Sequence, residues 1–132
     1  MKRKCITIAI GNQKGGVGKT SSTACIGAAL ALQGKRVLLV DLDAQQNLTF
    51  TLTQNEDPET SIYDALVKDK PLPIVPIRRN LDLVPASLDL ARAEIDMATM
   101  MAREGILKYH LDGQKEKYDY ILMDCSPSLG IV

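Results

Sequence analysis

Apolar residues gather in four short runs along the chain, and longer segments with helical spacing separate them. The runs cover residues 5–10, 36–41, 81–84 and 118–124. The second and fourth are almost continuous in apolar residues, which is typical of parallel strands covered on both faces. Strands that alternate with helices in this way predict an α/β fold built on a parallel sheet, with helices on both faces.

Two helices follow from local signals. Residues 20–33 are rich in alanine, and Gly34 provides a C-terminal stop. Ser61 is followed three residues later by Asp64, a spacing that predicts a capping box in front of the segment IYDALV.

A third, longer helix is predicted over residues 88–103, with Ser87 as its cap and Gly105 just past its end. Its small and apolar residues repeat at helical spacing, at Ala91, Ile95, Ala98 and Ala102. Residues 69–80 contain three prolines and therefore indicate an irregular connector.

The segment between the first run and the first helix reads KGGVGKT, residues 14–20. Glycines have no Cβ, so backbone N–H groups can close around phosphate oxygens, and the helix N-terminus adds further donors. Lys19 is placed to reach the β- and γ-phosphates, and the Thr20 hydroxyl to ligate Mg²⁺. The general pattern has glycine where this chain has Gln13, and Lys14 is an additional lysine. The alternative is a glycine-rich turn that binds nothing.

Carboxylates end two of the runs, where ligands of open α/β sheets bind. Asp41 and Asp43 end the second run, and the alternative for this pair is two solvated turn residues. Asp124 ends the fourth run, where it can hold Mg²⁺ or its waters beside Thr20. Asp119, at the start of that run, is interpreted as a surface residue.

Composition narrows the function classes. The length of 132 residues fits one domain, and sixteen basic and sixteen acidic residues cancel, so no global attraction to nucleic acid or membrane is expected. The basic start and its six apolar residues are too short for a secretory signal, which indicates a first strand in a cytoplasmic protein.

Cysteine and histidine give no metal signal. The cysteines, at positions 5, 25 and 125, are widely separated and odd in number, which favours reduced core residues over a disulfide or a zinc site. The single histidine, His110, is predicted to lie at the surface or at a helix end.

Three motifs resemble one family. KGGVGKT resembles the deviant Walker A motif K-G-G-x-G-K-[ST] of the dimeric ParA/MinD ATPases. DLDAQQN resembles their switch I, D-x-D-P-Q-G-N, with Ala44 for proline and Gln46 for glycine, and DCSPSLG resembles their switch II, with Ser126 for proline. TSIYDALV and LDLVPASLDLARAEI look like the chromosome and plasmid partition ATPases called ParA or Soj.

The resemblance implies a P-loop NTPase fold with strand order 3-2-4-1 and further strands beyond the first. It covers essentially all of residues 1–132, but only about the first half of such a protein. We therefore expect the N-terminal part of a single P-loop ATPase domain. The first run would then be an exposed edge strand, so we also expect this chain to self-associate and to turn over ATP poorly.

Site residues follow from the same resemblance. The nucleotide-binding set is Lys14, Gly15, Gly16, Val17, Gly18, Lys19, Thr20 and Ser21, and the magnesium set is Thr20, Asp43 and Asp124. Lys14 would cross the dimer interface to the other subunit's nucleotide, Lys19 would neutralise developing charge, and Asp43 would orient the attacking water. Asp41 would help to organise the metal side.

The implied function is an ATP-binding and ATP-hydrolysing partition protein, with ATP and Mg²⁺ as cofactors. Its expected partners are a second copy of itself, nonspecific DNA and a ParB-like activator, without a membrane; its expected location is the cytoplasm, on the nucleoid. One alternative is a MinD-like ATPase that cycles on membranes. Another is a non-catalytic fragment that only binds nucleotide.

Overall fold

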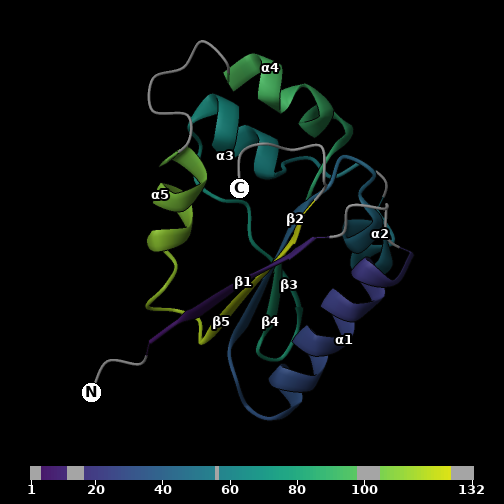
Figure 1. Cartoon of the computed structure of the whole chain (residues 1–132), viewed down its shortest axis with the longest axis vertical. Helices are drawn as coiled ribbons and strands as arrows, with labels where there is room; N and C mark the ends of the chain where they lie inside the picture. The colour runs from purple at the N-terminus through teal and green to yellow at the C-terminus, as the bar shows by residue number, and fades with distance from the viewer. Residues whose placement is uncertain (1–3, 12–16, 56, 98–104, 126–132) are drawn as a thin grey trace.

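A five-stranded sheet forms the centre of the computed structural model, which describes residues 4–11, 17–55, 57–97 and 105–125 (Figure 1). The strand order within these residues is β1-β5-β2-β4-β3. Pairing is parallel between all neighbours except β3 and β4. The strands are β1 (Ile6–Gly11), β2 (Val37–Leu42), β3 (Val75–Arg78), β4 (Leu81–Val84) and β5 (Tyr120–Cys125). The four predicted strands therefore take the order 3-2-4-1, and the expected α/β class is confirmed.

Strand β3 lies within residues 69–80, which the sequence predicted to be an irregular connector. That prediction is therefore wrong at β3. Val75–Arg78 pairs antiparallel with β4 at the edge of the sheet, and the register shifts between Pro76 and Arg78. Proline has no N–H to donate, and edge strands and bulges are the places in a sheet that tolerate it. Asn80, with a left-handed φ of 67°, turns the chain into β4.

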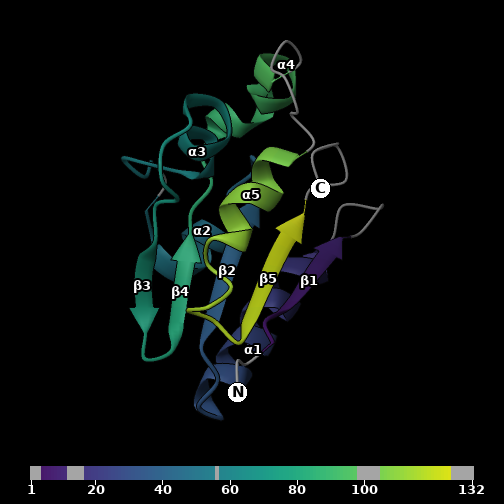
Figure 2. The same cartoon turned by 90° about the vertical axis from the view of Figure 1, so that its left-hand side faces the viewer.

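Helices cover both faces of the sheet, and α1 and α5 lie on opposite sides of it (Figure 2). One apolar cluster joins α1 and α2 to alternate residues of β2, β4 and β5, and the other joins α3, α4 and α5 to the opposite faces of β2 and β5. The helical elements are α1 (Val17–Leu32), α2 (Asn47–Thr53), α3 (Ile62–Lys68), the 3-10 helix η1 (Leu88–Arg92), α4 (Ala93–Met97) and α5 (Ile106–Asp112).

Helix α1 confirms the first predicted helix and its stop. Gly34 follows it with a φ of 85°, the left-handed conformation expected of a helix-ending glycine. A Cβ on Gly27 would lie 2.8 Å from Leu39 Cδ2, so the helix packs closely on β2. Cys25 points to the exposed side of α1 because Thr23 and Gly27 face the sheet, so its predicted burial is wrong.

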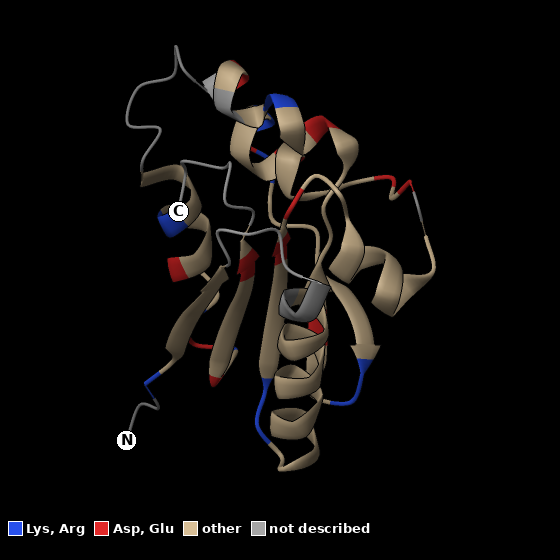
Figure 3. Ribbon diagram, turned by 45° about the vertical axis from the view of Figure 1, so that its right-hand side comes forward, with Lys and Arg blue, Asp and Glu red and all other residues tan. Residues whose placement is uncertain are grey.

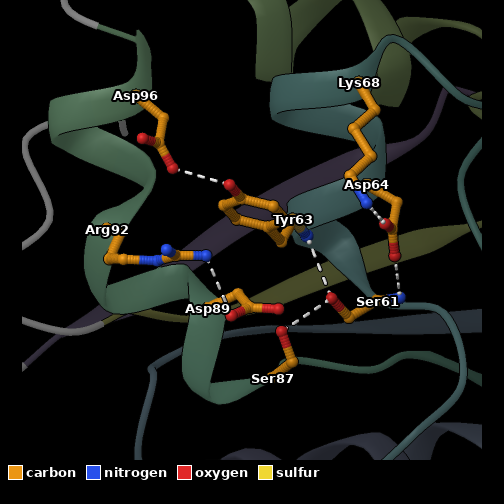
Figure 4. A network of polar contacts seen from close by, with 8 residues as sticks. All are labelled: Ser61, Tyr63, Asp64, Lys68, Ser87, Asp89, Arg92 and Asp96. Atoms are coloured by element: carbon orange, nitrogen blue, oxygen red, sulfur yellow. Dashed lines mark hydrogen bonds and ion pairs between the residues drawn. The ribbon is translucent and has the colours of Figure 1, made fainter.

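The capping box of α3 is confirmed, and it is part of a larger polar network (Figure 4). The Ser61 hydroxyl accepts from the Tyr63 backbone N–H at 3.2 Å, and the Ser61 N–H donates to Asp64 at 2.8 Å. Ser61 also donates to the Ser87 hydroxyl at 3.0 Å, and the Tyr63 phenol donates to Asp96 at 2.6 Å. The network ties α3 to the start of η1 and to α4.

The helix predicted over residues 88–103 is wrong in its first half. The structure has a 3-10 helix that passes into α4 there, and residues 98–104 lie outside the described part of the chain. Ser87 makes no cap hydrogen bond, because its hydroxyl is engaged with Ser61. Leu90 and Ala93 face the core, so Ile95 of the predicted apolar stripe is 75% exposed.

One further sequence interpretation changes, and another is confirmed. Asp119 is buried, because it accepts from the Arg36 backbone N–H at 2.8 Å and from the guanidinium at 3.4 Å. His110 lies in the last turn of α5 as predicted, but its side chain is only 8% exposed, and Nε2 lies 3.0 Å from the Ala65 carbonyl oxygen. Among the described residues, no helix is both long and apolar enough to cross a bilayer.

Candidate functional site

The candidate site lies at the carboxyl ends of the central strands, where acidic residues stand at the strand ends (Figure 3). Asp41 of β2 is in register with Asp124 of β5, and Asp124 is in register with Ile10 of β1. Parallel strands end at one edge of the sheet, so the two carboxylates lie at the same level beside the N-terminus of α1. The fold thus gathers the described residues of three sequence motifs at one edge.

Thr20 and Asp124 are in direct contact there. The Thr20 hydroxyl, in the first turns of α1, donates to Asp124 Oδ2 at 3.0 Å, although the two residues are 104 positions apart. Mg²⁺ takes oxygen ligands and is usually held by one or two carboxylates together with substrate phosphates. A hydroxyl beside a buried carboxylate fits that preference. The described residues contain no group of three or more Asp, Glu, His or Cys able to hold a metal.

Asp41 is fully buried and accepts three hydrogen bonds. Its Oδ2 accepts from the Thr49 backbone N–H at 2.9 Å and from the Thr49 hydroxyl at 2.7 Å, and its Oδ1 accepts from the Asp43 N–H at 3.1 Å. Burial, with a smaller contribution from the neighbouring Asp124 carboxylate, raises the pKa of Asp41 to about 6, although the hydrogen bonds from Thr49 and Asp43 lower it. Asp41 therefore fixes backbone around the site.

Asp43 begins the turn that leads into α2. Its Oδ1 accepts from the Gln45 N–H at 3.0 Å, its carbonyl accepts from the Gln46 N–H at 2.9 Å, and its side chain is only partly buried. Gln46 has a φ of 61°, in the left-handed region. This is the position where the resembling switch I pattern has glycine, the residue that takes this conformation without a steric cost.

The other predicted site residues are described less fully. Lys14, Gly15 and Gly16 lie outside the described residues. Residues 17–19 form the first turn of α1, and Ser21 is exposed on the same helix. The structure thus brings Thr20 to Asp124 and Asp41 to Asp43.

Thr49 was missed by the sequence analysis. It is one of three threonines in NLTFTLT, and nothing local separates it from Thr51 or Thr53. Its hydrogen bonds reach Asp41, 8 residues earlier in the chain, and the Ala86 N–H, 37 residues later. Only the fold reveals them.

These features define the class of protein. A mostly parallel sheet, a glycine-rich segment between β1 and α1, and a hydroxyl–carboxylate contact at the start of that helix are those of a P-loop nucleotide-binding protein. The family model of the AAA domain named AAA_31 matches residues 5–132, and the chain belongs to that family.

Sequence relatives show which members of this family the chain resembles. The sporulation initiation inhibitor protein Soj of Bacillus subtilis is 49% identical over 131 residues, covering 95% of this chain and 51% of that protein. The chromosome-partitioning ATPase Soj of Treponema pallidum is 43% identical over 130 residues, covering 96% and 50%. The chain spans about half the length of these curated relatives. The resemblance to ParA/Soj-type partition ATPases is confirmed.

A solved structure also matches almost the whole of this chain. Cobyrinic acid a,c-diamide synthase from Mycobacterium smegmatis, with bound ATP analog and magnesium, superposes with a TM-score of 0.90 at 42% identity. The match covers 96% of this chain and 53% of that one. Nucleotide and magnesium are thus bound by a relative with this fold.

Proposed function

We propose that this chain is the nucleotide-binding part of a ParA/Soj-type partition ATPase that binds ATP with Mg²⁺ and hydrolyses it as a dimer. The observation that carries the proposal is the contact of Thr20 with Asp124 behind the glycine-rich segment. The identity to the two Soj proteins, one of which is named a chromosome-partitioning ATPase, supports the partition role.

The chemistry is phosphoryl transfer to water, which depends on positioning and charge stabilisation. Residues 14–21 surround the phosphates, and Lys19 and Lys14 neutralise the charge that develops on them, Lys14 from the opposite subunit. Thr20 and Asp124 would hold Mg²⁺, which would supply positive charge to neutralise the phosphates. Asp43 orients the attacking water, and we also assign it to the metal side of the site.

The wider role is part of the same proposal. The dimer binds DNA nonspecifically, a ParB-like partner triggers hydrolysis, and the protein works in the cytoplasm on the nucleoid. Sixteen basic and sixteen acidic residues cancel in these 132 residues, so their net charge gives no overall attraction to DNA.

Calorimetry with ATP and Mg²⁺ tests the phosphate site. Lys19→Ala should abolish binding, whereas Lys35→Ala, which removes an exposed lysine in the turn after α1, should leave it unchanged. Thr20→Val should remove the magnesium dependence of binding and Thr20→Ser should keep it, because only the hydroxyl contacts Asp124. Equal affinity in wild type and Lys19→Ala would refute the site.

Single-turnover hydrolysis tests the role of Asp43. Asp43→Ala should retain ATP binding and lose hydrolysis, since it removes the water-orienting group and leaves the phosphate-binding residues in place. Lys14→Ala should weaken ATP-dependent dimerisation instead. A wild-type rate in the Asp43 variant would overturn its assignment.

The name of the Mycobacterium smegmatis structure offers a second candidate, an ATP-using diamide synthase. The two functions differ in what stimulates ATP turnover. Addition of cobyrinic acid should leave turnover unchanged if the partition proposal is correct. Stimulation would favour the synthase.

A further inference from the structure

We propose that Thr49 is a positioning residue that sets the geometry of the Asp43 turn by holding Asp41 against α2 and the segment after β4. This inference rests on the proposed ATPase function, in which Asp43 orients water. It concerns a residue outside the proposed phosphate and metal sets, whose hydroxyl is hydrogen-bonded within the protein.

The hydroxyl of Thr49 has two partners. It donates its one hydrogen to Asp41 Oδ2 at 2.7 Å and accepts from the Ala86 backbone N–H at 2.9 Å. Thr49 and Asp41 are both fully buried. A buried hydroxyl that donates to a carboxylate and accepts from an amide leaves little capacity for a ligand. Thr49 thus joins β2, α2 and the segment after β4 at a single oxygen atom.

Asp41 transmits this constraint to Asp43. Its second oxygen, Oδ1, accepts from the Asp43 N–H at 3.1 Å. The orientation of this one carboxylate is therefore coupled both to Thr49 and to the backbone of Asp43. Gln46 precedes α2 without a side-chain cap hydrogen bond. Asp41 caps the helix from the neighbouring strand instead, through the Thr49 N–H. The start of α2 and the Asp43 turn are therefore held by the same group.

The segment after β4 extends the constraint to α3. The Ile62 N–H donates to the Pro85 carbonyl at 2.8 Å, and the Ser61 hydroxyl donates to Ser87 at 3.0 Å. The first bond holds the backbone just before Ala86, and the second holds the side chain just after it. Thr49 is thus anchored to a segment that is itself held, which is the property required of a positioning residue.

Hydrogen exchange on this chain tests the geometry without requiring activity. Thr49→Val keeps the size of the side chain and removes the hydroxyl, so the Asp43 and Ala86 amides should exchange about tenfold faster, the ratio that corresponds to one hydrogen bond. Thr49→Ser should restore the wild-type rates. Leu111→Ala serves as a control for general destabilisation, because it empties a core position in α5 away from the site. Unchanged exchange at Asp43 in Thr49→Val would overturn the inference.

Turnover then tests the link to chemistry. Thr49→Val should lower kcat about tenfold with little change in nucleotide Kd, and Thr49→Ser should recover kcat. Faster exchange at Asp43 with a wild-type kcat would overturn the positioning role. If the wild-type chain binds no nucleotide and shows no turnover, the ATPase proposal fails, while the exchange result still decides whether Thr49 holds the turn.

Discussion

Strands β1 and β2 have the same length and are both rich in apolar residues, yet their surroundings differ. Every residue of VLLVDL in β2 is buried, whereas five of the six residues of ITIAIG in β1 are exposed. β2 has neighbours on both edges, β5 and β4, whereas β1 pairs with β5 alone among the described residues. An apolar run therefore predicts a strand, but its burial depends on what the rest of the chain places beside it.

The largest expected effect concerns the exposed strand. Ile6 and Ile8 are 48% and 39% exposed, and the outer edge of β1 carries no partner strand within the described residues. We expect the 14.4 kDa chain to self-associate through this edge, and Ile8→Lys to shift it towards monomer, since charge on an edge opposes pairing. Light scattering at micromolar concentration measures this.

The control for that experiment is Leu32→Lys, which adds the same charge on α1 at a position that is 82% exposed. It should leave association unchanged. A wild-type chain that is a monodisperse monomer with a cooperative thermal transition would contradict the expectation for β1.

The next effect compares one residue type in the two environments. Ile121 in β5 is fully buried and Ile8 in β1 is 39% exposed. Ile121→Ala should lower the free energy of unfolding by about 2–5 kcal/mol, as for other core truncations. Ile8→Ala should cost about 1 kcal/mol or less, because part of its surface is already in water. Urea denaturation at two protein concentrations separates stability from association, and equal losses would refute the comparison.

The turns that lead into the central strands give a smaller effect. Gly34, before β2, has a φ of 85°, and a Cβ there would meet nothing within 4 Å. Gly34→Ala should therefore cost about 1–2 kcal/mol through backbone strain alone. Gly113, before β5, has a φ of −67°, so Gly113→Ala should be neutral or stabilising by about 0.4–1 kcal/mol. Thermal melts should show a lower Tm for Gly34→Ala than for the wild type. They should show an unchanged or higher Tm for Gly113→Ala.

The smallest effect concerns a hydrogen bond made just before β5. The Tyr118 phenol donates to Asp82 Oδ2 of β4 at 2.7 Å, and burial followed by this bond raises the pKa of Tyr118. Tyr118→Phe should cost about 1 kcal/mol at neutral pH. A raised folded-state pKa contributes stability that is present below pH 10 and is lost as the pH rises through the folded value.

Ultraviolet titration of the phenols checks that sign. The phenol that ionises last should disappear in Tyr118→Phe and persist in Tyr120→Phe. If all phenols ionise together in the wild type, the bond to Asp82 does not protect Tyr118.

The sequence predicted the parallel strands because their apolar runs are continuous, and it predicted the cap of α3 because Ser61 and Asp64 interact locally. It missed α2 and α5, which have only seven residues each and no strong start signal of their own. It also missed the contacts of Thr49, since these join three separate segments. The motif residues could be named from the sequence, whereas the group that orients them could not.

The capping of α2 from a neighbouring strand has an experimental consequence. The chain contains no tryptophan, and Phe50 lies on α2 directly after Thr49 with 43% of its surface exposed. A tryptophan introduced at that position would be the sole indole of the protein. Its fluorescence would report in real time how the strand-capped helix responds when nucleotide arrives at the edge of the sheet.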